Sequence, residues 1–409
     1  LHYGHRRLLE RAKSLGDYLI VGVTAESFDK SRGKINVQQS LMERIEGVRA
    51  TGLADEIIIE EYEGQKIDDI RRYGVDIFTV GSDWVGKFDY LEEYCQVVYL
   101  PRTEGVSSSQ VRSDKRKISI RIVEDKGLGG KIIREGSYVN GVDILTLEDG
   151  TQEDAIYLFS TPQRHYELIK QAIGEGKHIL CETPIAMKES ECRELFALAK
   201  SKNVVLMEAI KTAYATAYNR LLLLVKSGVI GKVISVDATC TSLMDNYNPQ
   251  NLTGIWSSIT AWGPTALLPV FQILGTEYRE KHIISHFIDE DETFDGFTKI
   301  DFLYPEAVAT IKVAKAAKSE GSLVITGTKG YIYVPSPWWK TDYFEVKYEN
   351  QNQNKRFFYQ LDGEGIRYEM VAFSKEIESG VSSSYISEDV SVAIAKVMED
   401  WAAKKVSVI

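Results

Sequence analysis

The sequence predicts an α/β protein of three domains, and three observations lead to this prediction. Over the first 115 residues, apolar strand patterns alternate with amphipathic helices, as in a doubly wound parallel sheet. The alternation starts again near residue 116, and beyond residue 231 it gives way to strands typical of an open antiparallel sheet. A chain of 409 residues is also too long for one ordinary core. We therefore predict domains over 1–115, 116–231 and 232–409, the last of them α+β.

The elements of the first domain follow from residue periodicity. Behind His5, the residues Leu8, Leu9, Ala12 and Leu15 repeat at helical spacing, so a helix is expected there. Later helices are expected over 41–52 and 66–74, and strands over 17–23, 55–61, 76–84 and 95–101. The links between them are short and contain glycine, which favours a parallel, doubly wound arrangement.

The elements of the other two domains follow in the same way. Strands are expected over 154–162, 178–187 and 204–210, and helices over 164–177, 188–203 and 217–231. Antiparallel strands are then expected over 233–241, 282–288, 298–304, 307–314, 322–328, 330–335, 343–349 and 355–361, with a final helix over 368–380. A parallel α/β part followed by such a sheet is typical of a nucleotide-binding domain joined to a substrate or dimerisation domain.

Composition and charge exclude several classes of protein. A net charge of −10 argues against nucleic-acid binding, which needs a clustered basic surface. No apolar run approaches the roughly 20 residues that cross a bilayer, so we expect no membrane partner. The four cysteines are widely spaced and form no C-x-x-C pair, which fits a reducing cytoplasm better than a disulfide framework or structural zinc.

His2 and His5 stand three residues apart directly ahead of the first helix. Residues i and i+3 share a helix face, so both side chains can point at a ligand over the helix N-terminus. That end carries free amide N–H groups and a partial positive charge, so a phosphate is the expected ligand. The alternative is that both are ordinary surface residues near a terminus, or part of a tag remnant.

Polar residues also follow two of the expected strands. Ser82, Asp83 and Trp84 follow one of them, and RTEGVSSSQV, residues 102–111, follows another. Ligands of parallel sheets bind at these carboxyl ends. In the plainer interpretation, Trp84 caps the core and the serines begin a helix, a position that serine favours.

Together these stretches resemble the glycerol-3-phosphate cytidylyltransferases. The resemblance lies in residues 2–21, 80–91 and 97–111, and H-x-G-H followed in order by R-T-x-G-[IV]-S-[ST]-[ST] is a specific combination. It implies a transfer of CMP from CTP to a polyol phosphate, with attack in line, release of pyrophosphate and no protein nucleophile. A bridging magnesium ion is implied as well, and we assign no protein ligand to it. The implied catalytic residues are His2, His5 and Arg102, and the implied substrate-binding residues are Lys34, Arg44, Asp83, Trp84, Thr103, Ser107, Ser108 and Ser109.

The later domains resemble the NAD(P)-dependent glucose–fructose oxidoreductase and inositol dehydrogenase family. The resemblance lies in residues 159–187, 206–214, 227–238 and 325–339. It implies a Rossmann-like domain over 116–231, a substrate or dimerisation domain behind it, and NAD(P) as a cofactor. The implied cofactor-binding residues are Gly127, Gly129, Thr161, Pro162, His165, Glu182, Thr183, Pro184 and Lys211.

Departures from this second family concern its chemistry. Thr183 stands where the family's Glu-Lys-Pro turn has the lysine beside the nicotinamide, and Ala261 and Thr265 stand where it has two proton-handling residues. Threonine is no acid or base near neutral pH. Lys211, just past a strand end, is either a substitute or a solvated surface lysine.

Two pieces that the resembled folds need are missing from the sequence. The first family has a strand and a Gly-Thr-Phe-Asp-like turn ahead of H-x-G-H, and Ser82 here replaces the first Asp of its Asp-Asp-Trp. The stretch from Lys117 to Thr161 is too short for the expected strands and helices, since one βαβ unit alone takes about 30 residues. Its Gly-rich run, Gly127 to Gly130, fits G-x-G-x-x-G only in part. Either segments have been left out of this sequence, or the domain is naturally eroded and binds no cofactor.

We expect a cytoplasmic, homodimeric fusion enzyme. Its first domain would be a cytidylyltransferase, and its later domains would make or modify the polyol, a fusion that would suit CDP-polyol synthesis for cell-surface polymers. Two alternatives remain at this point: the later domains are a non-catalytic dimerisation or binding module, or the first domain adenylylates rather than cytidylylates.

Overall fold

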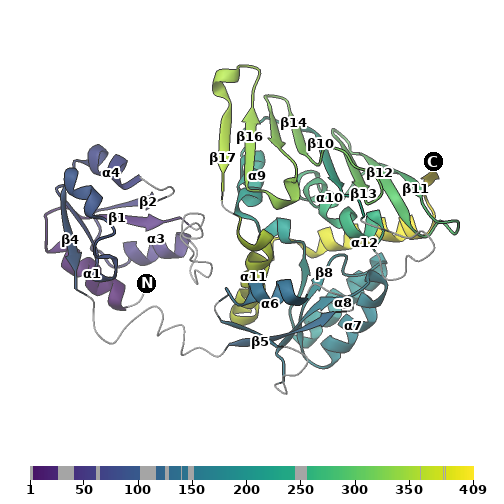
Figure 1. Cartoon of the computed structure of the whole chain (residues 1–409), viewed down its shortest axis with the longest axis horizontal. Helices are drawn as coiled ribbons and strands as arrows, with labels where there is room; N and C mark the ends of the chain where they lie inside the picture. Colours follow the sequence, from purple (N-terminus) through teal and green to yellow (C-terminus); the bar gives the residue numbers. More distant parts are fainter. Residues whose placement is uncertain are drawn as a thin grey trace. The chain divides into compact units, whose positions relative to one another are not determined.

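The computed structural model describes the chain except for residues 1–2, 26–40, 61–64, 102–116, 125–128, 140, 146–151, 245–255, 360, 381 and 383. The chain divides into two compact units, Leu1–Lys117 and Ile118–Ile409, and each is described by itself (Figure 1).

The first unit is a parallel α/β unit, as predicted. Among its described residues, β1 pairs with β2 and β3 pairs with β4, both in parallel, and no ladder joins the two pairs. The elements are α1 (Tyr3–Lys13), β1 (Ile20–Thr24), α3 (Leu41–Arg49), β2 (Glu56–Glu60), α4 (Gln65–Tyr73), β3 (Ile77–Gly81), η1 (Ser82–Trp84), η2 (Asp89–Glu93) and β4 (Gln96–Leu100).

Each strand pair of the first unit has its own small core. Val23, Ile45 and Val48 pack between β1 and α3. Ile70, Phe88 and Leu91 form the second core, with the β3–β4 pair packed around it. Helix α1 contacts β3 and β4, so the helix that begins with the histidine motif belongs to the second half of this unit.

The second unit begins with a parallel sheet. Its described strands run in the order β6-β5-β7-β8-β9. The chain therefore adds β6 on one side of β5 and then reverses direction, adding β7, β8 and β9 on the other side. Ligands of such sheets bind at the carboxyl ends beside this reversal, between β5 and β7. The elements are β5 (Ile118–Glu124), α6 (Gly129–Gly136), β6 (Val142–Leu145), β7 (Ala155–Phe159), α7 (Pro162–Gly174), β8 (His178–Glu182), α8 (Glu189–Lys202) and β9 (Leu206–Ala209).

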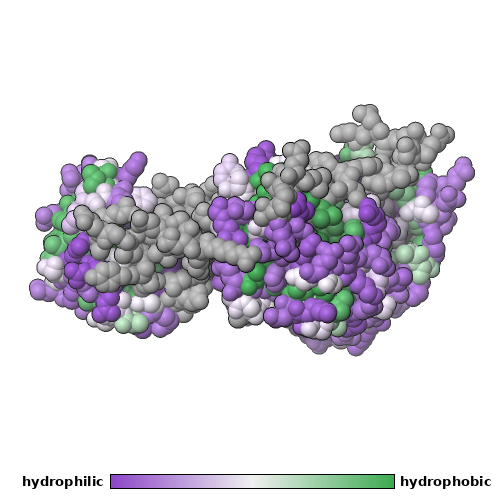
Figure 2. Space-filling view, turned by 90° about the horizontal axis from the view of Figure 1, so that it is seen from below, coloured by the Kyte–Doolittle hydropathy of each residue, from purple (hydrophilic) through white to green (hydrophobic). Residues whose placement is uncertain are grey.

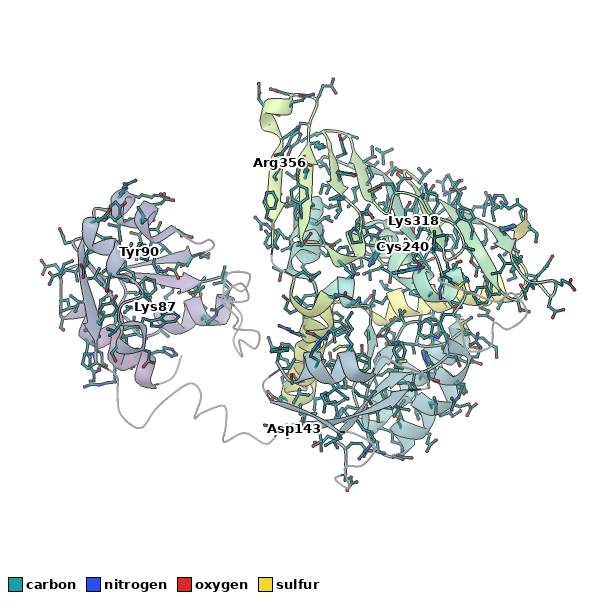
Figure 3. All side chains as sticks on the ribbon, viewed as in Figure 1. Lys87, Tyr90, Asp143, Cys240, Lys318 and Arg356 are labelled. Atoms are coloured by element: carbon teal, nitrogen blue, oxygen red, sulfur yellow. The ribbon has the colours of Figure 1, made fainter. Side chains whose placement is uncertain are left out.

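The link from β6 to β7 is as short as the sequence indicates. Only residues 146–154 connect the two strands. Among the described strands β6 lies at the edge of the sheet, and its residue Asp143 is labelled in Figure 3. Helix α6 lies close to this edge, because a Cβ atom on Gly136 would stand 2.4 Å from Cγ1 of Ile144. Only glycine permits this approach of helix to strand.

A large sheet follows. In the described residues it has nine strands in the order β17-β16-β15-β14-β10-β13-β12-β11-β18. The predicted antiparallel pairing holds for most neighbours, whereas β10–β13 and β11–β18 are parallel. The strands are β10 (Val233–Thr241), β11 (Glu280–Phe287), β12 (Asp295–Leu303), β13 (Val308–Ala314), β14 (Leu323–Gly327), β15 (Tyr331–Val334), β16 (Tyr343–Lys347), β17 (Lys355–Phe358) and β18 (Ser407–Val408).

Helices of the second unit link its two sheets. Helix α10 packs on β10, β12 and β13 and against α12, and α12 also packs on α8 (Figure 1). Val392 and Ala395 of α12 therefore enter the core built by β7, β8, α7 and α8. The helices and short turns are η3 (Lys211–Tyr214), α9 (Thr216–Lys226), α10 (Ser258–Leu274), η4 (Trp338–Lys340), η5 (Gln351–Gln353), η6 (Asp362–Gly365), α11 (Ile366–Ser379) and α12 (Glu388–Ala402).

Two of these helices were not anticipated from the sequence. Helix α10 is buried along most of its length and contains Pro264 and Pro269, so it shows neither helical periodicity nor the usual composition of a helix. Helix α12 lies beyond the final helix that we expected.

The surface of the second unit is mixed. On the face drawn in Figure 2, hydrophilic residues cover much of the coloured surface and are interspersed with smaller hydrophobic areas, as is ordinary for a protein surface. Within the part of the chain that is described, no helix has the length and apolarity needed to pass through a bilayer.

Candidate functional sites

The first candidate site is the N-terminal turn of α1. His5 lies in this turn and is exposed, and the turn contains no acidic residue. The partial positive charge of the helix end is therefore not neutralised by an acidic side chain of this turn.

Asp83 and Trp84 lie in η1, directly after β3. Asp83 is exposed, whereas Trp84 is half-buried, with its ring 5.8 Å from that of Phe88. The plainer interpretation of Trp84 as a core residue is therefore correct in part, and its remaining surface stays accessible to a ligand. Since α1 contacts β3, His5 and these two residues belong to the same half of the unit.

Arg44 lies in the other half of the first unit. It is part of α3, which packs on β1 and β2. Several expected site residues lie outside the described residues, namely His2, Lys34, Arg102, Thr103, Ser107, Ser108, Ser109 and, in the second unit, Gly127.

The second candidate site lies at the carboxyl ends of β7, β8 and β9. Thr161 precedes α7, which begins with Pro162, while Thr183 and Pro184 follow β8 and are joined by a cis peptide bond. Lys211 follows β9 at the start of η3. The structure thus brings these expected residues to one edge of the sheet, and Gly129 begins α6 after β5.

His165 joins two of the loops at this edge. It is fully buried, its Nδ1 lies 2.7 Å from the carbonyl oxygen of Pro184, and its Nε2 lies 2.9 Å from that of Ser160. The observed role of this side chain is to hold the loops after β7 and β8 together. Contact with a cofactor stays a prediction.

Thr183 does not point toward an open site. Its hydroxyl donates a hydrogen bond of 2.5 Å to Oε1 of Glu208, and both residues are buried. Burial raises the pKa of the Glu208 carboxyl, while the nearby hydroxyls of Ser391 and Thr183 act against this rise. The position where the family has its lysine is therefore used here to satisfy a buried acid.

Two glutamates converge on one tyrosine at the same edge. The Tyr157 hydroxyl lies 2.9 Å from Oε1 of Glu182 and 2.8 Å from Oε1 of Glu369, which comes from α11. A phenol has a single proton and donates to one acceptor at a time. The second contact is a hydrogen bond only if that carboxyl carries a proton of its own.

Electrostatics at this cluster favour such a proton. Burial raises the pKa of both carboxyls, and in Glu369 the neighbouring charge of Glu182 raises it further. The hydrogen bond from Tyr157 and the charge of Lys211 lower both pKa values, without offsetting the effect of burial. The carboxyl pair therefore holds at least one proton at a pH where an exposed glutamate has none.

Lys211 takes part in a second cluster. Its Nζ lies 3.0 Å from Oε2 of Glu364, which also accepts a bond of 2.6 Å from Lys131, while Oε1 accepts one of 2.7 Å from Lys340. The Lys211 ammonium is thus paired with a carboxylate from η6. Its expected role beside the cofactor stays a prediction.

Sequence reasoning missed five residues of these clusters. Tyr157 is polar within an otherwise apolar strand, and Glu369 is buried on α11, which are weak signals at most. The five are Tyr157, Glu369, Lys131, Lys340 and Glu364.

Comparisons with known proteins agree with the two-part organisation. Residues 1–114 match the cytidylyltransferase-like family, and residues 134–210 match the oxidoreductase family with an NAD-binding Rossmann fold. Over 118 residues the chain is 47% identical to glycerol-3-phosphate cytidylyltransferase of Bacillus spizizenii, covering 28% of this chain and 87% of that protein.

The second unit has more distant relatives. Over 245 residues the chain is 25% identical to trans-1,2-dihydrobenzene-1,2-diol dehydrogenase of Xenopus laevis, covering 57% of this chain and 72% of that protein. A 3-ketoreductase from Actinomadura kijaniata, solved with NADP and TDP-benzene, superposes with a TM-score of 0.60 at 14% identity, over 72% of this chain and 99% of that one. This likeness shows the fold alone. Through its first unit the chain belongs to the glycerol-3-phosphate cytidylyltransferase family, and it is an enzyme, a nucleotidyltransferase joined to a domain of the NAD(P)-binding oxidoreductase family.

Proposed function

We propose that the first unit transfers CMP from CTP to glycerol 3-phosphate or a closely related polyol phosphate. The observation that carries this proposal is the 47% identity to a glycerol-3-phosphate cytidylyltransferase over most of that protein's length. The exposed His5 on a helix N-terminus without acidic residues supports it, because the reaction needs positive charge around phosphates.

The proposed reaction requires positioning and charge stabilisation. A phosphate oxygen of the acceptor forms a bond to the α-phosphorus of CTP, and the bond to the pyrophosphate leaving group breaks. His2, His5 and Arg102 would stabilise the charge that develops on the phosphates. We propose that a magnesium ion bridges the phosphates of CTP and is held mainly by their oxygens.

The direct test is pyrophosphate release from CTP and magnesium across a panel of polyol phosphates, with ATP in place of CTP as a second arm. We expect release with CTP and glycerol 3-phosphate or a near relative. Two outcomes would contradict the proposal. One is pyrophosphate release with ATP in place of CTP, and the other is that no acceptor of the panel supports release with CTP.

For the second unit, we propose reduction of a carbonyl compound to the polyol phosphate that the first unit consumes. The specific observation in favour is the Tyr157, Glu182 and Glu369 cluster, which holds a proton at the ligand-binding edge of the sheet. Two consecutive steps in one chain would suit the synthesis of CDP-activated polyols for cell-surface polymers. We further propose that the protein is a cytoplasmic homodimer.

The residues at the Gly-rich end of this sheet fit a dinucleotide. Helix α6 begins at Gly129, after the first strand of the sheet, and such folds bind a pyrophosphate at this position. Gly136 allows the helix to approach β6 closely, and one glycine of the G-x-G-x-x-G pattern has the same purpose in dinucleotide-binding folds. Gly127, Gly129, Thr161, Pro162 and the Glu182–Pro184 turn would line the site. Bound NADPH or NADH would supply the hydride.

Proton transfer would come from the glutamate pair. Thr183, Ala261 and Thr265 have no group that titrates near neutral pH. Glu182 is only partly buried, whereas Tyr157 and Glu369 are buried behind it. We therefore propose that Glu182 donates the proton that the carbonyl oxygen takes up on reduction. Glu182 would then be reprotonated by Glu369 through the Tyr157 hydroxyl.

The rival function is a non-catalytic module, favoured by the turn of Thr183 toward Glu208. Two measurements distinguish the two functions. The change in NADPH fluorescence on mixing with the protein reports binding, and the loss of NADPH absorbance with ketose phosphates reports reduction.

The Tyr157 hydroxyl is tested by a pair of variants. Tyr157→Phe should lower turnover more than NADPH affinity, whereas Tyr166→Phe, which removes an exposed hydroxyl bonded to Glu194, should change neither. A protein that binds no NADPH would refute the reductase proposal.

A further inference from the structure

Three lysines from distant parts of the second unit meet at one carboxylate. Lys131 lies in α6, Lys211 in η3 and Lys340 in η4, and all three ammonium groups lie within 3.0 Å of a Glu364 oxygen. Their side chains remain about a third exposed, at 31%, 33% and 38%. The three lysine side chains are therefore in contact with solvent.

The lysine cluster lies at the ligand-binding edge of the parallel sheet. Lys131 is in the first turn of α6, which follows β5, and Lys211 follows β9 directly. Lys340 comes instead from the region that follows β15 of the large sheet. A ligand bound by all three lysines would thus contact both the part of the unit built on the parallel sheet and the part built on the large sheet.

Charge at the cluster is unbalanced. Three ammonium groups contact one carboxylate, and the nearby Glu135 is already paired with Arg367 and Arg134. Lys211 also interacts electrostatically with Glu182 and Glu369, whose carboxyls have raised pKa values and therefore carry less negative charge than an exposed pair. Partial burial acts to raise the pKa of Glu364, but the bonds from Lys131, Lys340 and Lys211 outweigh it and hold this pKa far below its ordinary value. An anion with more charge than a carboxylate would suit the cluster better.

The backbone that carries Glu364 is strained. Glu364 has φ of 56°, in the left-handed region that residues other than glycine seldom adopt. Gly363 and Gly365 flank it with positive φ, and Cβ atoms on them would lie 2.0 Å from the Glu135 carboxylate and 2.9 Å from the Lys211 carbonyl oxygen. The loop therefore accepts an unfavourable conformation to insert a carboxylate among the lysines.

We propose that Lys131, Lys211 and Lys340 form a binding site for a phosphate monoester, which Glu364 occupies until the phosphate displaces it. Three separate donors around one anion match the several oxygens of a phosphate. Because two of the three lysines lie outside α6 and its Gly-rich turn, we assign the site to a phosphorylated carbonyl substrate rather than to the cofactor. This assignment to substrate rests on the proposed reductase function, whereas the anion site itself does not.

The test measures binding of inorganic phosphate to the full chain by calorimetry at constant ionic strength. Glu364→Gln removes the competing charge and should tighten phosphate binding about tenfold, and adding Lys340→Ala should reverse the gain. Glu306→Gln is the matched control, since this exposed glutamate pairs only with Lys232 among the described contacts. Equal affinity in the wild type and Glu364→Gln would overturn the site.

Further arms separate the two sources of phosphate. Dihydroxyacetone phosphate should gain affinity in Glu364→Gln as inorganic phosphate does, and NADP⁺ should not. A gain for NADP⁺ alone would overturn the assignment to substrate. If the substrate phosphates bind as expected but are never reduced with NADPH, the reductase proposal fails and the anion site stands.

A second variant covers the case in which Glu364→Gln does not fold, as judged by circular dichroism. Lys340→Gln in the otherwise unchanged chain removes one donor and should weaken phosphate binding about tenfold. Unchanged affinity in this variant would contradict the proposal.

Discussion

The two units of this chain share different properties with their relatives. The first unit is 47% identical to a glycerol-3-phosphate cytidylyltransferase over 118 residues, and His5 lies in the first turn of a helix, where a phosphate is expected. The second unit has the fold of a ketoreductase at 14% identity, while Thr183, Ala261 and Thr265 stand where we expected titratable groups from the resemblance. A fold tolerates such replacement because packing depends on size and polarity, whereas a reaction depends on particular groups.

The difference teaches how each unit has to be analysed. In the first, catalysis by positioning can be assigned from residues that match a motif. In the second, the residues at the expected motif positions do not titrate near neutral pH, and only the structure shows which titratable side chains lie nearby. Tyr157, Glu182 and Glu369 are such a group, and they come from three separate elements.

The largest effect is expected in the first unit. His5→Ala should lower cytidylyl transfer about 10²- to 10³-fold, as does loss of one group that stabilises transition-state charge elsewhere. Arg6→Ala is the control on the same helix, because Arg6 makes only a surface ion pair with Glu10 in the described contacts. NADPH binding by the second unit should be the same in both variants. Unchanged pyrophosphate release in His5→Ala would refute the assigned role.

A smaller effect tests the close packing of α6 on the second unit's sheet. Gly136→Ala should lower the free energy of unfolding by about 1–3 kcal/mol, since its Cβ would overlap Ile144. Gly130→Ala meets no atom within 4 Å and should stabilise the same helix by about 0.5–1 kcal/mol. Urea unfolding followed by tryptophan fluorescence reports this unit, which holds every tryptophan except Trp84. If both variants change the free energy of unfolding in the same direction, the packing of α6 on β6 described above is contradicted.

The last prediction concerns the pKa values of the glutamate pair, Glu182 and Glu369. Because the native carboxyls have pKa values raised above the ordinary 4.5, the folded unit binds more protons than the unfolded chain at higher pH. The free energy of unfolding should therefore fall as pH rises above 4.5 toward neutrality, by at most about 1.4 kcal/mol per pH unit for each proton. Glu369→Gln should flatten this slope.

Glu194→Gln is the control for this pH dependence. The bonds from Lys170 and Tyr166 lower the pKa of Glu194, so its contribution to stability changes only below 4.5. Glu364 behaves likewise, because its pKa is lowered too. A slope that Glu369→Gln leaves unchanged would show that the pair holds no extra proton.

Much of the fold was predictable, because strands and helices here follow local periodicity. The antiparallel strands of the large sheet were predicted nearly to their ends, and the short link before β7 was predicted from length alone. Helix α10 was not, since a helix buried on most sides has no polar face to give it a period.

The site of the second unit was predictable only in part. The threonine at position 183, where the resemblance implies a lysine, was visible in the sequence, and the structure shows its hydroxyl bonded to Glu208. The partners of Lys211 and Tyr157 were not, because Glu364 and Glu369 lie 153 and 212 residues away along the chain. Such pairs form because η6 and α11 return to the parallel sheet, and no local sequence pattern indicates this return.

The central claim is that the two units act in sequence on one substrate. The most direct measurement is pyrophosphate release from CTP and magnesium with dihydroxyacetone phosphate as the sole acceptor precursor, with and without NADPH. We expect release only when NADPH is present, and its loss in both His5→Ala and Tyr157→Phe. Release with added glycerol 3-phosphate but never from the ketose phosphate and NADPH would contradict the claim and leave the second unit a binding module.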